Sequence, residues 1–237
     1  QRQMCIRDRK LCESIRRHRN GRHTREKNYR YACEVFSKVP VKPGKKKRVG
    51  ITGEIYMKYS KLGNDDIESF LLRQGMEPYS GGFVNYCLYL VDTERYKAEK
   101  YQRNPIMAKA CAFVLHRLCE AQKHLLTVIG ETDRFQTDLP FPELKEKVQG
   151  ILVEGCNTGD GWLIAAEVIQ YVEKGCGSVL ILHPFGCLVS HVCERGILQR
   201  LHARFPDVSI QTIEYDYDQS KTLRESCLLY TSDAADD

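Results

Sequence analysis

The sequence predicts an α/β protein with a doubly wound, mostly parallel, Rossmann-like sheet and with extra helices at the N-terminus and in the middle. Two observations favour this class. Three aliphatic or β-branched runs bounded by turns are typical of buried strands: RVGIT (48–52), SVLIL (178–182) and VSIQTIEY (208–215). In the second half these runs alternate with helical patterns, which favours parallel strands joined by right-handed crossovers.

The segments after the first strand are mostly helical. Asn64 can cap a helix over DDIESFLLRQ (65–74), whose first turn is acidic and which Gly75 ends. FVNYCLYLV (83–91) fits either a short helix or a strand. A helical stretch then covers about 93–128. Its apolar residues recur at spacings of three and four and predict one buried stripe, made of Met107, Cys111, Val114, Leu118, Ala121, Leu125 and Val128.

The second half continues as helix, strand, helix, strand and helix. TDLPFPELKEKVQG (137–150) is typical of a loop that leads into a helix. LIAAEVIQYVEKG (163–175) is amphipathic and ends at a glycine, and a further helix spans about 187–205. DYDQSKTLRES (216–226) begins one more helix. Trp162, the only tryptophan, is expected to anchor the core.

Both ends of the chain resemble translated sequencing-adapter DNA. QRQMCIRDR (1–9) and CLLYTSDAADD (227–237) correspond to the two strands of a transposase adapter used to prepare sequencing libraries. We therefore expect the genuine sequence to be a fragment of a longer parent. It comprises a helical segment with a basic linker (10–46) and an α/β domain (47–226) that contains the helical stretch.

Composition narrows the range of partners. The net charge is +5, and RRHRNGRHTREK (16–27) and KKKR (45–48) flank the expected domain instead of lying within it. They lack interleaved aromatic residues over most of their length, so we expect a solvated surface or linker, and nucleic acid binding is the weakest hypothesis. No run approaches the ~18 apolar residues of a membrane span, so no membrane partner is expected.

The cysteines indicate a reducing, cytoplasmic environment. Eleven are present, and Cys5 and Cys227 fall in the adapter-like ends. The others form no Cys-x-x-Cys motif and no pattern of a disulfide-stapled secreted module. Most of them are expected to be small buried hydrophobic residues.

Four turns are candidates for a ligand site. TGEIY (52–56), HPFGC (183–187) and EYDYDQS (214–220) each follow a predicted strand, and CNTGDGW (156–162) opens a helix. Ligands of doubly wound sheets bind outside the carboxyl ends of the strands, so the first three turns are expected to share one edge. The fourth joins them if its chain reaches the same edge, where its helix amides can hold an anion.

The turn before the 187–205 helix contains two cysteines and two histidines. Cys187 and His191 lie one helical turn apart and form a plausible pair. Cys193 is about 240° further round an α-helix, so it is expected to pack in the core. Two candidates are too few for a complete metal site. A buried corner cysteine beside a helical histidine stays an open alternative.

The other turns supply acids, glycines and one more sulfur. Glu54 is either a ligand acceptor or a solvated carboxylate, and Asp160, between Gly159 and Gly161, either caps its helix or helps to hold phosphate. Asp216 and Asp218 follow a strand as caps or ligand contacts, and Cys156 can supply a second sulfur. No P-loop and no Gly-x-Gly-x-x-Gly fingerprint is present.

Several of these motifs together resemble the C-terminal part of the acyl-CoA dehydratase activase-related proteins. They are RVGITGEIYMKYSKLGNDDIESFLLRQG, NTGDGWLIAAEVI, LILHPFGCLVSHVCERGILQRLHARFPDVSI and IEYDYDQS. Members of that family, common in anaerobes, join an ATPase module of the actin and sugar-kinase type to regions similar to 2-hydroxyacyl-CoA dehydratase subunits. Where family members carry glutamine this chain has His183, so His183 is not expected to be a ligand. Asp160 replaces a glutamate, and Val189 and Ser190 replace proline and asparagine.

The resemblance implies a function and a set of site residues. It implies a module linked to an iron–sulfur cluster or to a CoA thioester and coupled to an ATPase elsewhere in the parent; the alternative is a non-catalytic docking domain. A [4Fe-4S] cluster held by Cys187, with Cys156, is implied, whereas ATP is not expected to bind this part. The implied cofactor-binding residues are Glu54, Tyr56, Gly159, Asp160, Gly161, Phe185, Gly186, His191 and Asp216. The implied partners are other parent domains, dehydratase subunits and acyl-CoA, and activity of this part alone is not expected.

Overall fold

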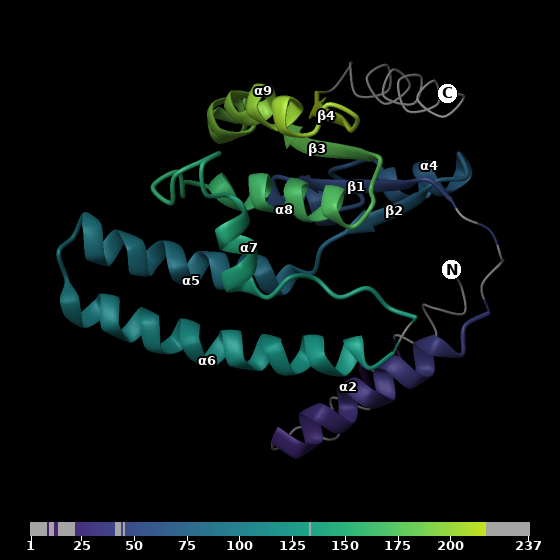
Figure 1. Ribbon diagram of the computed structural model, residues 1–237, viewed down its shortest axis with the longest axis horizontal. Coiled ribbons are helices and arrows are strands. Elements are labelled where there is room, and N and C mark those ends of the chain that lie inside the picture. The colour runs from purple at the N-terminus through teal and green to yellow at the C-terminus, as the bar shows by residue number, and fades with distance from the viewer. Residues whose placement is uncertain are drawn as a thin grey trace.

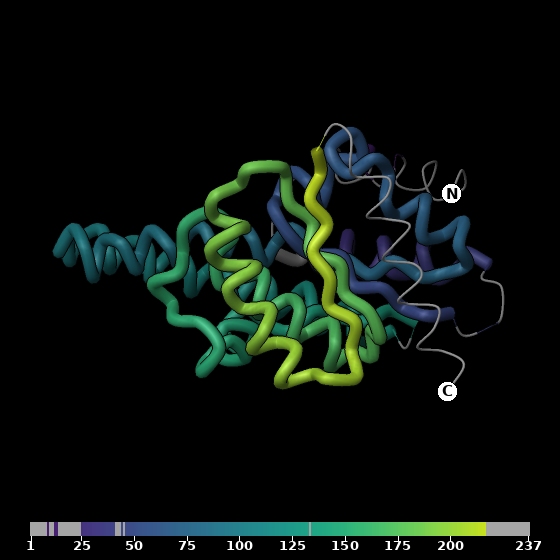
Figure 2. Tube along the Cα trace, turned by 90° about the horizontal axis from the view of Figure 1, so that it is seen from above, coloured from purple at the N-terminus to yellow at the C-terminus, as the bar shows by residue number. Residues whose placement is uncertain are grey.

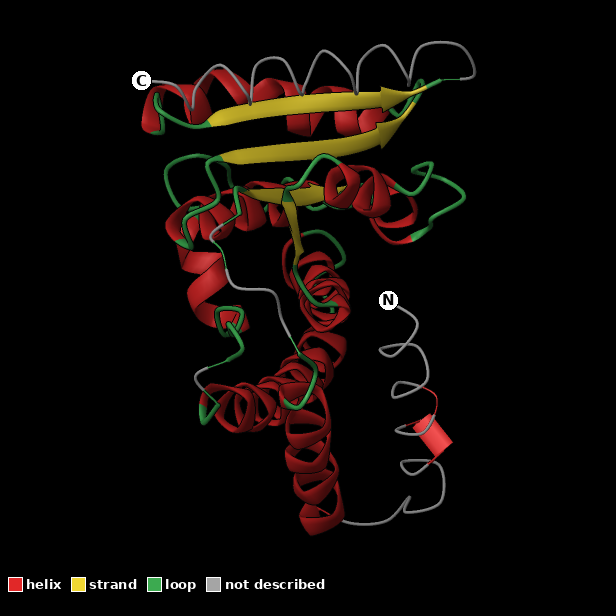
Figure 3. Cartoon of the chain, turned by 90° about the vertical axis from the view of Figure 1, so that its right-hand side faces the viewer, coloured by secondary structure: helices red, strands yellow, loops and turns green. Residues whose placement is uncertain are grey.

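The protein forms one four-stranded parallel sheet (Figure 3). The computed structural model describes residues 22–40, 44, 46–132 and 134–216, together with residues 9, 12 and 13. The strands lie in the order β2-β1-β3-β4, and all neighbours are parallel. Their bounds are β1 (Arg48–Gly53), β2 (Glu77–Ser80), β3 (Ser178–Pro184) and β4 (Ser209–Tyr215). The predicted class and parallel sheet are confirmed.

Helices cover both faces of this sheet (Figure 1). One face carries α3 (Ile55–Tyr59) and α4 (Ile67–Arg73). The other face carries α8 (Gly161–Glu173), α9 (Arg195–Arg204) and the π-helix η1 (Ser190–Glu194), with α7 (Phe141–Lys147) against α8. Three helices lie further from the sheet: α2 (Arg22–Ser37), α5 (Phe83–Lys100) and α6 (Pro105–Gly130).

The chain adds its strands on opposite sides of β1. The chain passes from β1 to β2 on one side, and β3 and then β4 are added on the other side of β1. Such a reversal is the topological switch point of a doubly wound sheet, and ligands of such sheets bind outside the carboxyl ends of the strands at this point. The fold therefore predicts a ligand site at the carboxyl ends of β1 and β3.

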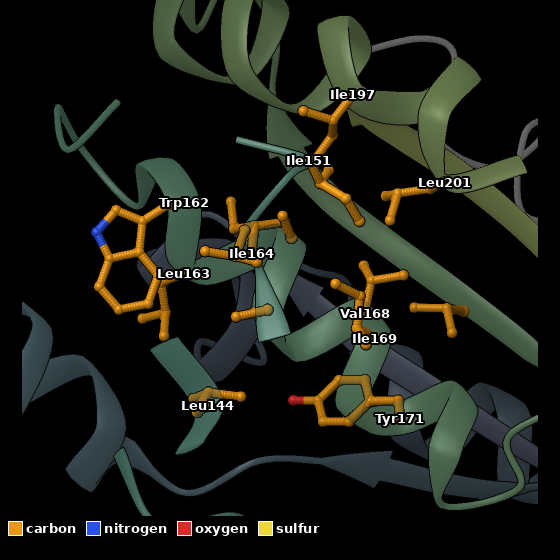
Figure 4. Packing of buried hydrophobic residues seen from close by; sticks show 14 of the residues in the cluster. Leu144, Ile151, Trp162, Leu163, Ile164, Val168, Ile169, Tyr171, Ile197 and Leu201 are labelled. Atoms are coloured by element: carbon orange, nitrogen blue, oxygen red, sulfur yellow. The ribbon is translucent and has the colours of Figure 1, made fainter. Parts of the chain in front are cut away.

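The larger part of the core lies between the sheet and α8. Eleven consecutive residues of this helix are buried, from Gly161 to Tyr171. Figure 4 shows side chains of α8 meeting Leu144 of α7 and Ile197 and Leu201 of α9. Trp162 stacks edge-on to Tyr89 with ring centroids 5.1 Å apart, which confirms it as a core anchor. A second cluster packs α3 and α4 against the opposite face.

The middle of the chain is a helical hairpin of α5 and α6 that extends beyond the sheet (Figure 2). The ambiguous segment 83–91 is helical, and the helical stretch expected over about 93–128 is divided between α5 and α6, the second of which begins at Pro105. The predicted stripe of α6 is partly wrong, because Met107, Val114 and Leu118 are exposed and Cys111 is only half-buried, although Val128 is buried. The inward face also includes a buried link, in which the Gln122 side-chain amide donates to Asn85 Oδ1 at 2.5 Å.

Strand β2 had no counterpart in the sequence patterns. It is only four residues long, is polar and contains Pro78. Proline cannot donate to a ladder, so it is tolerated here because β2 is an edge strand with β1 as its single neighbour. The helix expected over 65–74 is present as α4, but it begins later, at Ile67, and its N-cap is Asp66 and not Asn64. Asn64 Oδ1 accepts the Ile67 amide at 3.4 Å from the preceding turn. No helix of the described ranges has the length and apolar composition needed to cross a membrane.

A buried ion pair ties α3 and α8 to the end of β1. Lys58 Nζ lies 2.7 and 2.8 Å from the two carboxylate oxygens of Glu167, and the Thr52 hydroxyl donates to the same carboxylate at 2.5 Å. Both charged side chains are almost fully buried. Burial alone lowers the pKa of Lys58, but the Glu167 carboxylate more than offsets it and the pKa is raised. Lys58 therefore stays charged in the core.

A close backbone approach joins β1 to β3. Gly53 has φ +131°, and a Cβ at this position would lie 2.0 Å from the Leu182 carbonyl oxygen. The next amide, that of Glu54, donates to this same oxygen at 2.8 Å. Only glycine fits both the backbone angle and the space.

We expect Lys58→Met to lower the free energy of unfolding by about 3–5 kcal/mol, because it leaves the Glu167 carboxylate buried without its cation. The double variant Lys58→Met/Glu167→Met should recover most of this loss, since both charges are then removed. Urea unfolding followed by circular dichroism measures both. A double variant as unstable as Lys58→Met would contradict the role of Lys58 as the buried counter-charge of Glu167.

We expect Gly53→Ala to lower the free energy of unfolding by about 2–4 kcal/mol, through a strained φ and a clash with Leu182. Gly196→Ala is the matched control, because a Cβ at Gly196 in α9 meets no atom within 4 Å. That substitution should stabilise by about 0.5–1 kcal/mol, since alanine favours the helix. Thermal unfolding of the two variants distinguishes these opposite signs.

Candidate functional site

The first turn places Glu54 at the carboxyl end of β1. Its carboxylate oxygen Oε2 accepts the amides of Tyr56 and Met57, each at 3.0 Å, and so caps α3. The Tyr56 side chain is 55% exposed and projects from the first turn of this helix. Glu54 thus stabilises the start of α3. Its negative charge also helps to raise the pKa of Asp160, in the turn before α8.

The turn before α8 reaches the same edge. Asp160 Oδ2 accepts the Ile55 amide at 3.3 Å, which joins this turn to the end of β1. The turn is tight, because a Cβ on Gly161 would lie 2.1 Å from the Cys156 carbonyl oxygen. A Cβ on Gly159 would lie 3.0 Å from Val189, so the turn also packs against the third motif. The CNTGDGW turn therefore reaches the same edge of the sheet as the turn after β1, as the sequence analysis required for a shared site.

The third turn connects β3 to η1. The Phe185 amide donates to the Tyr215 carbonyl at 3.0 Å, and the Gly186 amide lies 3.4 Å from Glu214 Oε1. Cys187 is half-buried. The expected Cys187–His191 pair exists, but it joins the His191 ring to the Cys187 carbonyl and not to its thiol: Nδ1 lies 2.8 Å from that oxygen.

The fourth turn is described only as far as its start. Asp216 follows β4 and is half-buried. Asp218 lies outside the described residues. The structure therefore tests the placement of Asp216 at this edge and leaves the role of Asp218 as a prediction.

Cys193 lies on η1 and is buried, as expected. Burial raises the pKa of the Cys193 thiol, and the charges of Cys156, Glu194 and Cys187 add to this effect. The sequence prediction assumed an α-helix here, whereas residues 190–194 form a π-helix with more residues per turn.

Two buried carboxyl groups retain protons near neutral pH. Burial raises the pKa of Asp160 to about 7, and the charge of Glu54 adds to the effect. Burial likewise raises the pKa of Glu194 to about 8, with contributions from Asp160 and Glu54. Groups tuned to this range can donate or accept a proton at physiological pH, which is how general acids and bases work.

A further group of ligand atoms lies beside the third turn. His183, His191 and Glu214 each offer one atom, and these atoms all lie within 4.8 Å of one another. Sequence reasoning set His183 aside and did not consider Glu214. The strand pattern could have indicated this pair. His183 and Glu214 lie near the ends of neighbouring parallel strands, and the register of the sheet makes them partners.

Comparisons with family models, with curated proteins and with solved structures yield no significant match to this chain.

We expect Asp160→Asn to flatten the pH dependence of stability. The folded protein holds a proton up to about pH 7, whereas the unfolded chain releases it near the ordinary value of 3.8. Folding therefore binds a proton in this window, and Asp160 makes stability fall as the pH rises, by up to about 1.4 kcal/mol per unit.

Urea unfolding at a series of pH values measures this effect as the difference between the original protein and the variant. The exposed Asp207→Asn is the matched control. A difference that does not change between about pH 4 and about pH 7 would show that Asp160 ionises as an ordinary carboxyl group.

Proposed function

We propose that this chain is an iron–sulfur or CoA-thioester-linked module of a 2-hydroxyacyl-CoA dehydratase/activase-type system, coupled to an ATPase elsewhere in its parent. One observation carries the proposal: the four motifs of the resemblance, which are far apart in the sequence, meet at one edge of the sheet. Ile55 contacts Asp160, Gly159 packs against Val189, and Gly186 contacts Glu214. An edge at the topological switch point is where such folds bind ligands.

The resemblance assigns Cys187 and Cys156 to a cluster at this edge. Iron–sulfur clusters are held by thiolates, most often four. Two cysteines leave the other positions to a ligand or to residues of another domain of the parent. A cluster bound there would supply electron transfer.

The acidic residues beside these cysteines suit chemistry on a thioester substrate. Asp160 and Glu194 are carboxyl groups that hold a proton near neutral pH because they are buried. In this proposal they hold or move protons at the edge while the amides of the turns orient the acyl-CoA. Asp160 stands where members of the family carry a glutamate. It differs from the family pattern but keeps a carboxyl group at that position.

A second candidate, a docking domain of the same parent, is favoured by the apolar side chains of this edge. Phe185, Leu188 and Val192 are each more than 60% exposed and follow one another on the third turn and η1. Exposed large apolar residues grouped in one place mark contact surfaces more often than solitary ones do. Here the surface would accept another domain of the parent protein.

Anaerobic reconstitution with iron and sulfide tests the first candidate. We expect the chain to acquire both elements in the ratio of a [4Fe-4S] cluster, with its broad visible absorption. Cys187→Ser and Cys156→Ser should lose most of the bound iron, because each removes a thiolate ligand.

Cys87→Ser is the matched control, since Cys87 is an exposed thiol on α5. Iron retained by Cys187→Ser at the level of the control would sink the cluster hypothesis. Failure of both the chain and the intact parent to take up iron would leave the docking candidate in its place.

A further inference from the structure

The register of the sheet places two metal-ligating side chains next to each other. His183 of β3 pairs with Glu214 of β4, and paired residues of parallel strands point to the same face. That face is covered by η1, which supplies His191. The two imidazole rings lie edge-on with centroids 5.5 Å apart. Three different elements therefore converge on one point.

His183 lacks the partners that a buried polar group requires. Its side chain is 0% exposed, and neither ring nitrogen has a hydrogen-bond partner. An unsatisfied buried polar group costs on the order of 1–3 kcal/mol, so such groups are rare without a function. A ring nitrogen without a hydrogen-bond partner can bind a metal ion, for which imidazole is a common ligand.

His191 is oriented as a metal ligand by its other nitrogen. The Cys187 carbonyl oxygen, 2.8 Å from Nδ1, can only accept, so Nδ1 carries the hydrogen. The other ring nitrogen, Nε2, lies 3.5 Å from Glu214 Oε1 and is the atom left to bind a metal ion. Metal-bound histidines are commonly fixed in this way, with the second nitrogen donating to a backbone carbonyl.

Glu214 is held by its second oxygen. The Arg195 guanidinium donates to Oε2 at 2.8 Å, which orients the carboxylate and leaves Oε1 facing the two histidines. The Glu214 side chain is 21% exposed and that of His191 is 34% exposed, so a small ligand can reach this group from solvent. His183 closes the site from the protein side.

We propose that His183, His191 and Glu214 bind a divalent transition-metal ion of the Zn²⁺ type, with one coordination position open to solvent. Two imidazoles and one carboxylate are the ligand set of zinc sites that keep an open position, and imidazole selects transition metals over Mg²⁺ and Ca²⁺. An ion here can polarise a carbonyl or activate a water molecule. This inference does not rest on the proposed cluster, because it uses no cysteine thiol.

Calorimetric titration with Zn²⁺ under reducing conditions tests the site, using the original protein and two variants of similar shape, His183→Gln and Glu214→Gln. We expect each variant to bind Zn²⁺ at least about 100-fold more weakly, because a three-ligand site loses one ligand. His202→Gln, which changes an exposed histidine of α9, should bind like the original. Unfolding in the presence of a chelator checks that both variants are folded, and either folded variant is sufficient for the test.

X-ray absorption of the Zn²⁺-loaded protein separates this site from adventitious binding to thiols. A first shell of nitrogen and oxygen that disappears in His183→Gln supports the proposal. A shell that contains sulfur, or an affinity that His183→Gln leaves unchanged, would overturn it. A proton shared between His191 and Glu214 would then account for the geometry. Because iron uptake is measured separately, failure of one proposal leaves the other standing.

Discussion

The ion pair between Lys58 and Glu167 is the contact on which the rest of the edge depends. It joins the end of α3 to the middle of α8 and, through Thr52, both helices to β1. Glu54 begins α3 and Asp160 precedes α8, so the position of each acid follows from where this pair holds its helix. Taking two charges out of water costs free energy, so such a pair persists only where its partners are held in good alignment, as Lys58 and Glu167 are.

The parallel topology then brings two kinds of chemistry to one edge. Asp160 lies in the turn before α8, and Glu194 lies on η1. His183 and Glu214 lie near the ends of β3 and β4, and His191 joins them from η1. The Cys187 carbonyl orients the His191 ring, and π-helical turns such as η1 are frequent at functional sites.

The sequence predicted the class of fold and the location of the site for physical reasons that are local. Aliphatic runs with turns at their ends predict β1, β3 and β4, and the crossover rule then sets their common direction. Glu54, Asp160, Gly186 and Cys187 were found because each follows a strand or opens a helix. Strand β2 and the inward face of α6 could not be found in this way. The first depends on its neighbour β1. The second depends on contacts with distant segments, among them the hydrogen bonds of Gln122 with Asn85 and with the Phe141 amide.

What the sequence alone determined is therefore the set of elements and the edge at which the turns gather. Only the tertiary structure decided which side chains meet there. His183 and Glu214 are partners through the register of β3 and β4, and a register is a property of two strands together. His191 lies beside His183 on a five-residue π-helix, and no spacing rule for an α-helix anticipates that turn. Local patterns encode local structure, whereas a site is built from contacts between distant segments.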